Sequence, residues 1–146
     1  MLSGRFFKYS SIVFLVLFGA ACSKSVEGES TSSRTVILDK ATQTILDQDI
    51  EYPSESDAQI SASTVRIEPG AETGFHRHDA PLVAYILSGT LTVYYDGGVV
   101  KEYSPGTALV EAIGTYHNGR NEGTEPVEIL AVSIGAEGIE NTVARP

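Results

Sequence analysis

Gly70-Ala71-Glu72-Thr73-Gly74-Phe75-His76-Arg77-His78 and Gly114-Thr115-Tyr116-His117-Asn118-Gly119-Arg120-Asn121 together hold all three histidines of this 146-residue chain. His76 and His78 are two residues apart, so on an extended strand both side chains point to the same face. His117 must then come from another strand. Glycines in both stretches supply turns that would bring the three imidazoles to one point. We therefore predict a mononuclear metal site.

The chain beyond Thr35 is a series of short β-branched and aromatic runs separated by turn residues, without a long stretch of helical periodicity. We predict an all-β domain with strands at residues 36–38, 63–67, 74–78, 82–87, 90–95, 99–103, 108–111 and 127–134. Asp96-Gly97-Gly98 predicts a tight hairpin, because Asp-Gly supplies the positive φ angles that such a turn needs. Residues 41–62 are too irregular to assign. Strands at this spacing suit a β-sandwich or a jelly roll.

The two histidine stretches resemble the paired motifs of the cupin superfamily, in which G-x5-H-x-H-x3,4-E-x6-G is followed by G-x5-P-x-G-x2-H-x3-N. The positions in register are Gly70, His76, His78, Gly89, Gly106, Gly114, His117 and Asn121. The resemblance implies a single jelly-roll (cupin) β-barrel, in a small, single-domain, three-histidine cupin, and structural roles for the glycines and the asparagine. Two positions depart from the motifs: Leu82 stands where the family has a ligand glutamate, and Ala112 where it has a proline.

The resemblance also implies that His76, His78 and His117 bind one divalent metal ion. Three neutral imidazoles leave open coordination positions, as reactive sites do. Without the glutamate the ion keeps its full double charge, which favours a small anionic or chelating molecule as ligand or substrate. Iron, zinc, manganese and nickel are all open as the metal. The alternative is that the histidines occupy inherited positions and no longer bind metal.

The sequence shows no obvious general base, because all three histidines are assigned to the metal. Proton transfer would then fall to Tyr85, Tyr116 or Glu111, which lie near the motifs, or to metal-bound water. Each side chain also has a simpler interpretation, since tyrosines commonly pack in sheets and glutamates are commonly solvated or hydrogen-bonded. Glu111 is a further candidate as a replacement for the missing carboxylate ligand.

Residues 1–21 have the layout of a secretory signal peptide. Arg5 and Lys8 precede an apolar stretch at residues 12–18, which small residues follow at 19–21. The apolar stretch is shorter than the roughly 20 residues that a membrane-spanning helix needs. We therefore expect an exported protein.

Cys22 is the only cysteine and directly follows the small residues. This arrangement resembles a bacterial lipoprotein box, in which the cysteine is lipidated, with Gly19 as a departure from the usual pattern. Simple cleavage after Ala21 is the alternative. Residues 22–34 are rich in Ser, Thr and Glu and predict a flexible linker, so the folded barrel domain is expected at residues 35–146.

Composition and motifs together limit the function. With 10 basic against 19 acidic side chains, the chain has no electrostatic footprint for nucleic acid. We predict a periplasmic or outer-membrane-attached bacterial lipoprotein, anchored to the membrane through Cys22, that acts as a dioxygenase-like metalloenzyme on a small chelating acid or thiol. A metal-dependent lyase, hydrolase or isomerase is one alternative, and a non-catalytic module that binds a small ligand or metal is another. A homodimer is open, because dimers are common in the family.

Overall fold

Nine β-strands and no helix make up residues 32–146, the part of the chain that this computed structural model describes. The strands are β1 (Ala58–Ile67), β2 (His76–Arg77), β3 (Leu82–Ser88), β4 (Leu91–Tyr95), β5 (Val100–Tyr103), β6 (Ala108–Val110), β7 (His117–Arg120), β8 (Val127–Ala136) and β9 (Val143–Ala144). The all-β prediction is confirmed. No helix with the length and hydropathy needed to span a bilayer occurs in this range. The predicted signal peptide, Cys22 and most of the predicted linker lie outside the described residues.

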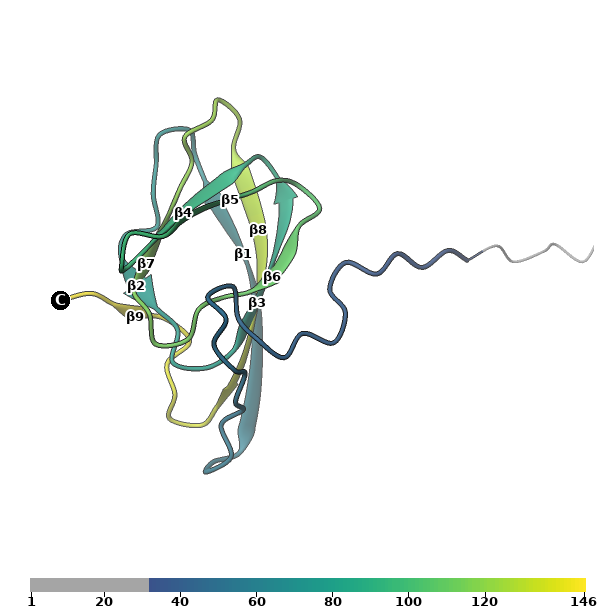
Figure 1. The fold of residues 1–146 in the computed structure, drawn as a ribbon, viewed down its shortest axis with the longest axis vertical. Helices are drawn as coiled ribbons and strands as arrows, with labels where there is room; N and C mark the ends of the chain where they lie inside the picture. The colour runs from purple at the N-terminus through teal and green to yellow at the C-terminus, as the bar shows by residue number, and fades with distance from the viewer. Residues whose placement is uncertain (1–31) are drawn as a thin grey trace, which may run out of the picture. The chain divides into compact units, whose positions relative to one another are not determined.

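The strands form two antiparallel sheets that face each other around a common interior (Figure 1). One sheet has the order β1-β8-β3-β6 and the other has the order β5-β4-β7-β2-β9. The chain therefore moves repeatedly between the two sheets, as it does in a jelly roll. The long pairing of β1 with β8 forms one wall of the barrel, and the shorter strands β7, β2 and β9 lie side by side in the other sheet.

The turn chemistry predicted from the sequence is present. Asp96-Gly97-Gly98 connects β4 to β5, and Gly97 and Gly98 have φ angles of 88° and 85°. Gly89, between β3 and β4, has a φ of 69°, and a Cβ atom there would lie 2.6 Å from the carbonyl oxygen of Pro126. Only glycine fits this close approach of two backbones. Asn121 also has a structural role, because its amide donates to the carbonyl oxygens of Ile67 and Glu125, both at 2.9 Å.

Four features differ from the predicted strands. The strand predicted at residues 36–38 is wrong: these residues are exposed and pair with nothing in the described chain, because β propensity needs a partner strand to form a ladder. The strand predicted at 74–78 is reduced to His76–Arg77, since Gly74 has a φ of 76°. β1 begins at Ala58, inside the segment that could not be assigned. β7 and β9 were not predicted as strands.

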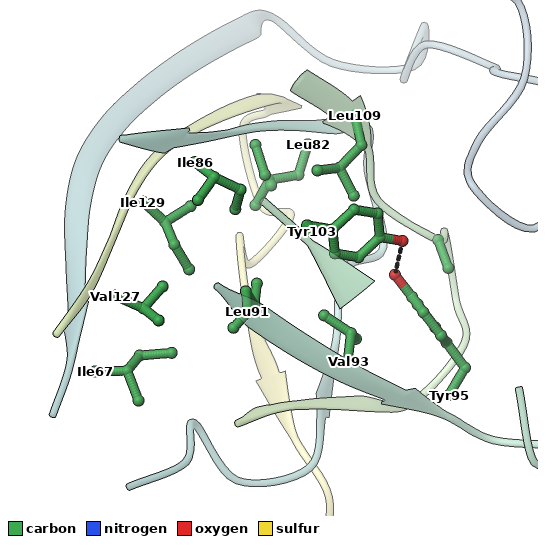
Figure 2. Close-up of a cluster of buried hydrophobic side chains, with 12 residues drawn as sticks. Ile67, Leu82, Ile86, Leu91, Val93, Tyr95, Tyr103, Leu109, Val127 and Ile129 are labelled. Atoms are coloured by element: carbon green, nitrogen blue, oxygen red, sulfur yellow. Dashed lines mark hydrogen bonds between the residues drawn. The ribbon is translucent and has the colours of Figure 1, made fainter. Parts of the chain in front are cut away.

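Apolar side chains from both sheets fill one part of the barrel (Figure 2). Leu82, Ala84 and Ile86 alternate inward along β3. Leu91, Val93 and Tyr95 do the same along β4. Figure 2 shows the Tyr95 side chain at the edge of this cluster, with its hydroxyl directed at that of Tyr103. The core therefore ends in polar groups on one side, and the histidines lie next to them.

Candidate metal centre

The three histidines converge from neighbouring segments of the five-stranded sheet. His76 on β2 is the direct cross-strand partner of His117 on β7. His78 lies just past β2, where it forms a single bridge with Ile113. The ring centroids are 4.6 to 5.1 Å apart, and the three candidate ligand nitrogens all lie within 4.8 Å of one another. The predicted convergence of the three imidazoles is confirmed.

Each imidazole is oriented by a backbone carbonyl that contacts its Nδ1 atom. The three acceptors are the carbonyl oxygens of Gly74 at 2.9 Å from His76, Asn141 at 2.7 Å from His78, and Thr115 at 3.0 Å from His117. A carbonyl oxygen can only accept a hydrogen bond, so Nδ1 carries the proton in all three rings. The unprotonated Nε2 atom is then the one available to a metal, as in metal sites whose ligand histidines donate through their other nitrogen.

Burial keeps at least two of these rings neutral. It lowers the pKa of His117 from 6.5 to about 4, although the hydrogen bond to the Thr115 carbonyl acts in the opposite direction. Burial also lowers the pKa of His78, and the neighbouring His117 and His76 rings add to this effect. Neutral imidazole is the form that binds a metal ion. His78 and His117 are therefore in their metal-binding form at neutral pH.

The donor set fits one divalent transition-metal ion. Imidazole nitrogen is a ligand for zinc, iron, nickel and copper, and three such donors leave positions open for other molecules. No carboxylate joins the cluster among the described residues. Leu82, at the family's glutamate position, is buried and lines the cavity instead. An ion held here by His76, His78 and His117 would keep both of its charges and attract an anion.

A cavity of about 690 Å³ opens onto the histidines. Its apolar lining comes from both sheets, with Leu82, Ala84 and Ile129 on one side and Leu91 and Val93 on the other. A volume of this size and a largely apolar wall with a few polar groups are typical of small-molecule sites.

Glu111 follows β6 and lines the same cavity as the histidines. Its side chain is almost fully buried, with 6% of the residue exposed. The hydroxyl of Tyr95 donates to Oε2 at 3.0 Å. Burial raises the pKa of Glu111 above its ordinary value, and the Tyr95 hydrogen bond and the nearby His78 ring oppose that rise. A buried carboxyl group whose pKa is raised by its surroundings is a candidate for proton transfer.

Tyr95 and Tyr103 are site residues that the sequence analysis missed. Their hydroxyls lie 3.1 Å apart, and burial raises the pKa of each phenol, so both stay protonated (Figure 2). The inward orientation of Tyr95 could have been predicted from the sequence, because Tyr95 alternates with Leu91 and Val93 along the same strand. Its contact with Glu111 could not be seen, because that contact depends on how the two sheets are placed.

Tyr85 and Tyr116 do not line the cavity. Tyr85 lies on the outward side of β3 and is half-buried. The Tyr116 hydroxyl accepts a hydrogen bond from Arg77 at 2.9 Å, and its ring packs against the guanidinium of Arg145 at 4.5 Å. Arg77 also pairs with Asp79 at 2.7 Å. Of the three predicted proton-transfer candidates, the structure brings only Glu111 to the cavity.

The geometry of the barrel and its histidines agrees with a known family. The model of the Cupin domain matches residues 63–133, which include all three histidines and Glu111. The chain belongs to the cupin superfamily. The resemblance carried by the two histidine motifs is confirmed. No protein of curated function matches this cupin.

Solved structures of other proteins resemble this cupin. DMSP lyase DddQ of Ruegeria pomeroyi is 24% identical, with a TM-score of 0.51 over 62% of this chain and 44% of its own. An uncharacterised conserved protein from Klebsiella pneumoniae with a double-stranded β-helix domain is 18% identical, with a TM-score of 0.52 over 66% of this chain and 91% of its own. Oxalate decarboxylase of Lactobacillus farciminis, in a formate complex, is 26% identical, with a TM-score of 0.51 over 58% of this chain and 26% of its own. This cupin therefore spans less than half of the lyase and about a quarter of the decarboxylase.

Proposed function

We propose that this cupin is a metal-dependent lyase that acts on a small carboxylic acid. The observation that carries the proposal is the placement of Glu111, a buried carboxyl group, in the same cavity as His76, His78 and His117. The three histidines bind the ion, and Glu111 acts as the general base that removes a proton from the carbon next to the substrate's carboxylate. Departure of a leaving group from the adjacent carbon then completes the elimination.

The chain's own residues prepare this proton transfer. Tyr95 donates to Oε2 of Glu111, and together with a backbone hydrogen bond from Ala112 it fixes the plane of the carboxyl group. Tyr103 in turn holds the Tyr95 hydroxyl in place. We assign positioning roles to both tyrosines. The apolar walls formed by Leu82 and Leu91 limit the water that could compete for the proton.

A divalent ion at the histidines would supply electrostatic stabilisation for the negative charge that develops on the substrate carboxylate. One structural relative supports a small acid as the substrate class, since the Lactobacillus farciminis protein is an oxalate decarboxylase.

Elemental analysis of the protein, purified without chelators, tests the metal centre. We expect about one divalent ion per chain in the wild type and none in a His76→Ala, His117→Ala double variant that keeps its β-sheet circular dichroism. Proton abstraction is then tested by incubating the loaded protein with small acids in heavy water and following exchange at the α-carbon by NMR. A loaded protein that exchanges no α-proton and cleaves no acid contradicts the lyase proposal.

A dioxygenase acting on a chelating acid or thiol is the second candidate. In the part of the chain that the structure describes, no carboxylate joins the histidine cluster. This favours the second candidate, because the site then resembles the three-histidine cupins that are thiol and diketone dioxygenases. Iron in the purified protein, with oxygen consumed in proportion to substrate, would support this candidate. Tight binding of a small acid without exchange, cleavage or oxygen uptake would instead indicate a binding module.

We also propose that the protein is exported and anchored through a lipid on Cys22. The support is the order of charges, apolar residues and small residues before Cys22. Mass spectrometry of the N-terminal peptide tests this proposal. A diacylglyceryl cysteine at position 22, absent from a Cys22→Ala variant, is the expected result, and an N-terminus at Met1 would contradict it.

A further inference from the structure

Three serine hydroxyls line the cavity from the four-stranded sheet, which lies across the interior from the sheet that carries His76 and His117. Ser61 on β1 and Ser133 on β8 are direct cross-strand partners, so their side chains point to the same side of the sheet. Ser63 is two residues along β1 and shares that side. The three hydroxyls therefore form one group, which we call the serine cluster.

The serine cluster is free to bind a ligand. Ser133 is only 8% exposed, and it lines the cavity. No buried side-chain oxygen in the described part of the chain lacks a hydrogen-bond partner, so the Ser133 hydroxyl is not a sealed, unpaired group but one that a molecule in the cavity can reach. Ser61 and Ser63 also line the cavity, and both residues are exposed. Ser133 thus offers a hydroxyl to the cavity.

The charges around the cavity restrict what the serine cluster can recognise. Glu111 and Arg145 are the charged side chains that line the cavity in the described chain. Arg145 is already engaged, because it pairs with Asp96 and its guanidinium packs 4.5 Å from the rings of both Phe75 and Tyr116. A second anionic group on the ligand would therefore find no available cation among the residues that line the cavity. A hydroxyl or carbonyl group needs no cation, because serine both donates and accepts.

The size and lining of the cavity add a third restriction. About 690 Å³ is far more than a two-carbon acid fills, and Leu91 and Ala131 supply apolar surface along the wall. A ligand that uses the whole cavity has an apolar segment between its two polar ends.

We propose that Ser61, Ser63 and Ser133 form a subsite for the uncharged polar end of the substrate, which is a monocarboxylic acid with a hydroxyl or carbonyl group beyond a short apolar segment. The assignment of the carboxylate to the histidine end rests on the proposed function. The serine cluster determines which acids bind, and dicarboxylates of the same length are excluded by charge.

The test is calorimetric titration of the full chain loaded with zinc. The probes are straight-chain monocarboxylates of four to eight carbons in three matched forms, with a terminal hydroxyl, a terminal methyl or a second carboxylate. In the wild type we expect the best hydroxy acid to bind about three- to tenfold tighter than its methyl counterpart, the range of one net hydrogen bond. The dicarboxylate should be the weakest of the three.

The matched variants are Ser133→Ala and Ser104→Ala, the second at an exposed serine between β5 and β6 that does not line the cavity. Ser133→Ala should remove most of the preference for the hydroxy acid and leave the affinity for the methyl acid within twofold. Ser104→Ala should change neither affinity. A Ser61→Ala, Ser63→Ala double variant with the same loss of preference would extend the result to the whole serine cluster.

The outcomes separate this proposal from the metal-dependent function. If zinc binds but the hydroxy and methyl acids bind equally, or if Ser133→Ala weakens both by the same factor, the subsite is overturned and the metal centre stands. If zinc does not bind, the proposed function fails, and the serine cluster is judged by NMR with a linear diol as the probe. Shifts of the amide signals of Ser61, Ser63 and Ser133 would then support the subsite, and unchanged signals would overturn it.

Discussion

The inner and outer sides of β2 carry residues that are adjacent in sequence but lie in opposite surroundings. On the inner side, His76 and His78 are held by backbone carbonyls in a cluster of three imidazoles. On the outer side, Arg77 pairs with Asp79, and the two side chains are 32% and 39% exposed. Water and salt screen the outer pair but reach the inner groups far less. Polar interactions of His76 and His78 are therefore expected to be stronger than the exposed ion pair of Arg77, although the residues are adjacent in sequence.

The side chains on the inner side of β2 also have fewer alternative hydrogen-bond partners than those on the outer side. Each imidazole there has its proton fixed by one carbonyl, and Glu111 is oriented by Tyr95. The outer residues form a chain of mutual contacts in which Tyr116 accepts from Arg77 and stacks on Arg145. Because each outer side chain is held by several contacts, the loss of one contact should change the stability of the fold little. We therefore expect substitutions on the inner side to have the larger effects.

The largest effect is expected from His117→Ala, which removes one of three ligand nitrogens. The affinity for zinc should fall by about a thousandfold or more, because the two remaining donors no longer define a site. Competition with a colorimetric zinc chelator measures the change. An affinity within tenfold of the wild type would show that His117 is not a ligand and would remove the basis of the comparison.

If Glu111 is the general base, as we propose, Glu111→Gln should slow proton abstraction strongly while zinc still binds. We expect the rate of α-proton exchange to fall by about 100-fold or more, the contribution typical of a general base. Zinc affinity should change by less than tenfold, since Glu111 is not part of the histidine cluster. A Tyr95→Phe variant provides the graded control, because it keeps the carboxyl group and removes only the hydrogen bond that orients it. A full rate in Glu111→Gln would assign the base elsewhere.

Leu82→Glu would place a carboxyl group at the family's ligand position. In the metal-free protein we expect a loss of about 2 to 4 kcal/mol in the free energy of unfolding, because Leu82 is buried and the new carboxyl has no partner. The affinity of the variant for zinc should rise by about tenfold, because the new carboxylate supplies a fourth, charged ligand. Urea unfolding with and without zinc measures both changes. A variant destabilised equally in both conditions would contradict the expected coordination.

The pH dependence of stability should reveal the neutral imidazoles. Burial lowers the pKa of folded His117 to about 4 from 6.5, so between these values the unfolded chain binds more protons. The free energy of unfolding of the metal-free protein should therefore fall as the pH is lowered from 6.5 towards 4. The raised pKa of Glu111 has the opposite effect on the free energy of unfolding above pH 4.5. The measurement is therefore made in the Glu111→Gln variant, which lacks this carboxyl group. In that variant, stability that does not fall across this range would contradict the neutral, buried state of His117.

The smallest effect is expected from Arg77→Ala on the outer side. Because the ion pair with Asp79 is partly exposed, the free energy of unfolding should change by less than about 1 kcal/mol. Zinc affinity should stay within twofold of the wild type. Thermal unfolding and the chelator competition provide the two readouts. A large loss of metal affinity would show that the two sides of β2 are coupled and that the comparison fails.

Patterns that depend on local spacing were predictable from the sequence. The convergence of the histidines follows from two-residue alternation and glycine turns, and the hairpin at Asp96-Gly97-Gly98 follows from turn chemistry. β7 was missed because His-Asn-Gly-Arg has little β propensity, and its pairing with β4 makes it a strand. The strand expected at residues 36–38 failed for the opposite reason, since its propensity found no partner.

Contacts across the barrel could not be predicted. Glu111 meets Tyr95 only because β4 and β6 lie in facing sheets, and neither position is unusual in its own segment. The serine cluster depends on the register of β1 against β8, which pairs Ser61 with Ser133 across 72 residues of chain. Sequence patterns indicate which side of a strand a residue takes but not what it faces.

The bond from the His78 ring to the backbone carbonyl oxygen of Asn141 links the histidine cluster to the segment between β8 and β9. Any residue at position 141 would present the same oxygen, so exchanging its side chain leaves the bond intact. Inserting or deleting a residue between Gly138 and Val143 would move that oxygen away from the ring. At this position the site depends on the number of residues in the segment and not on which residues they are. A scan of point substitutions would therefore not detect the contribution of this hydrogen bond.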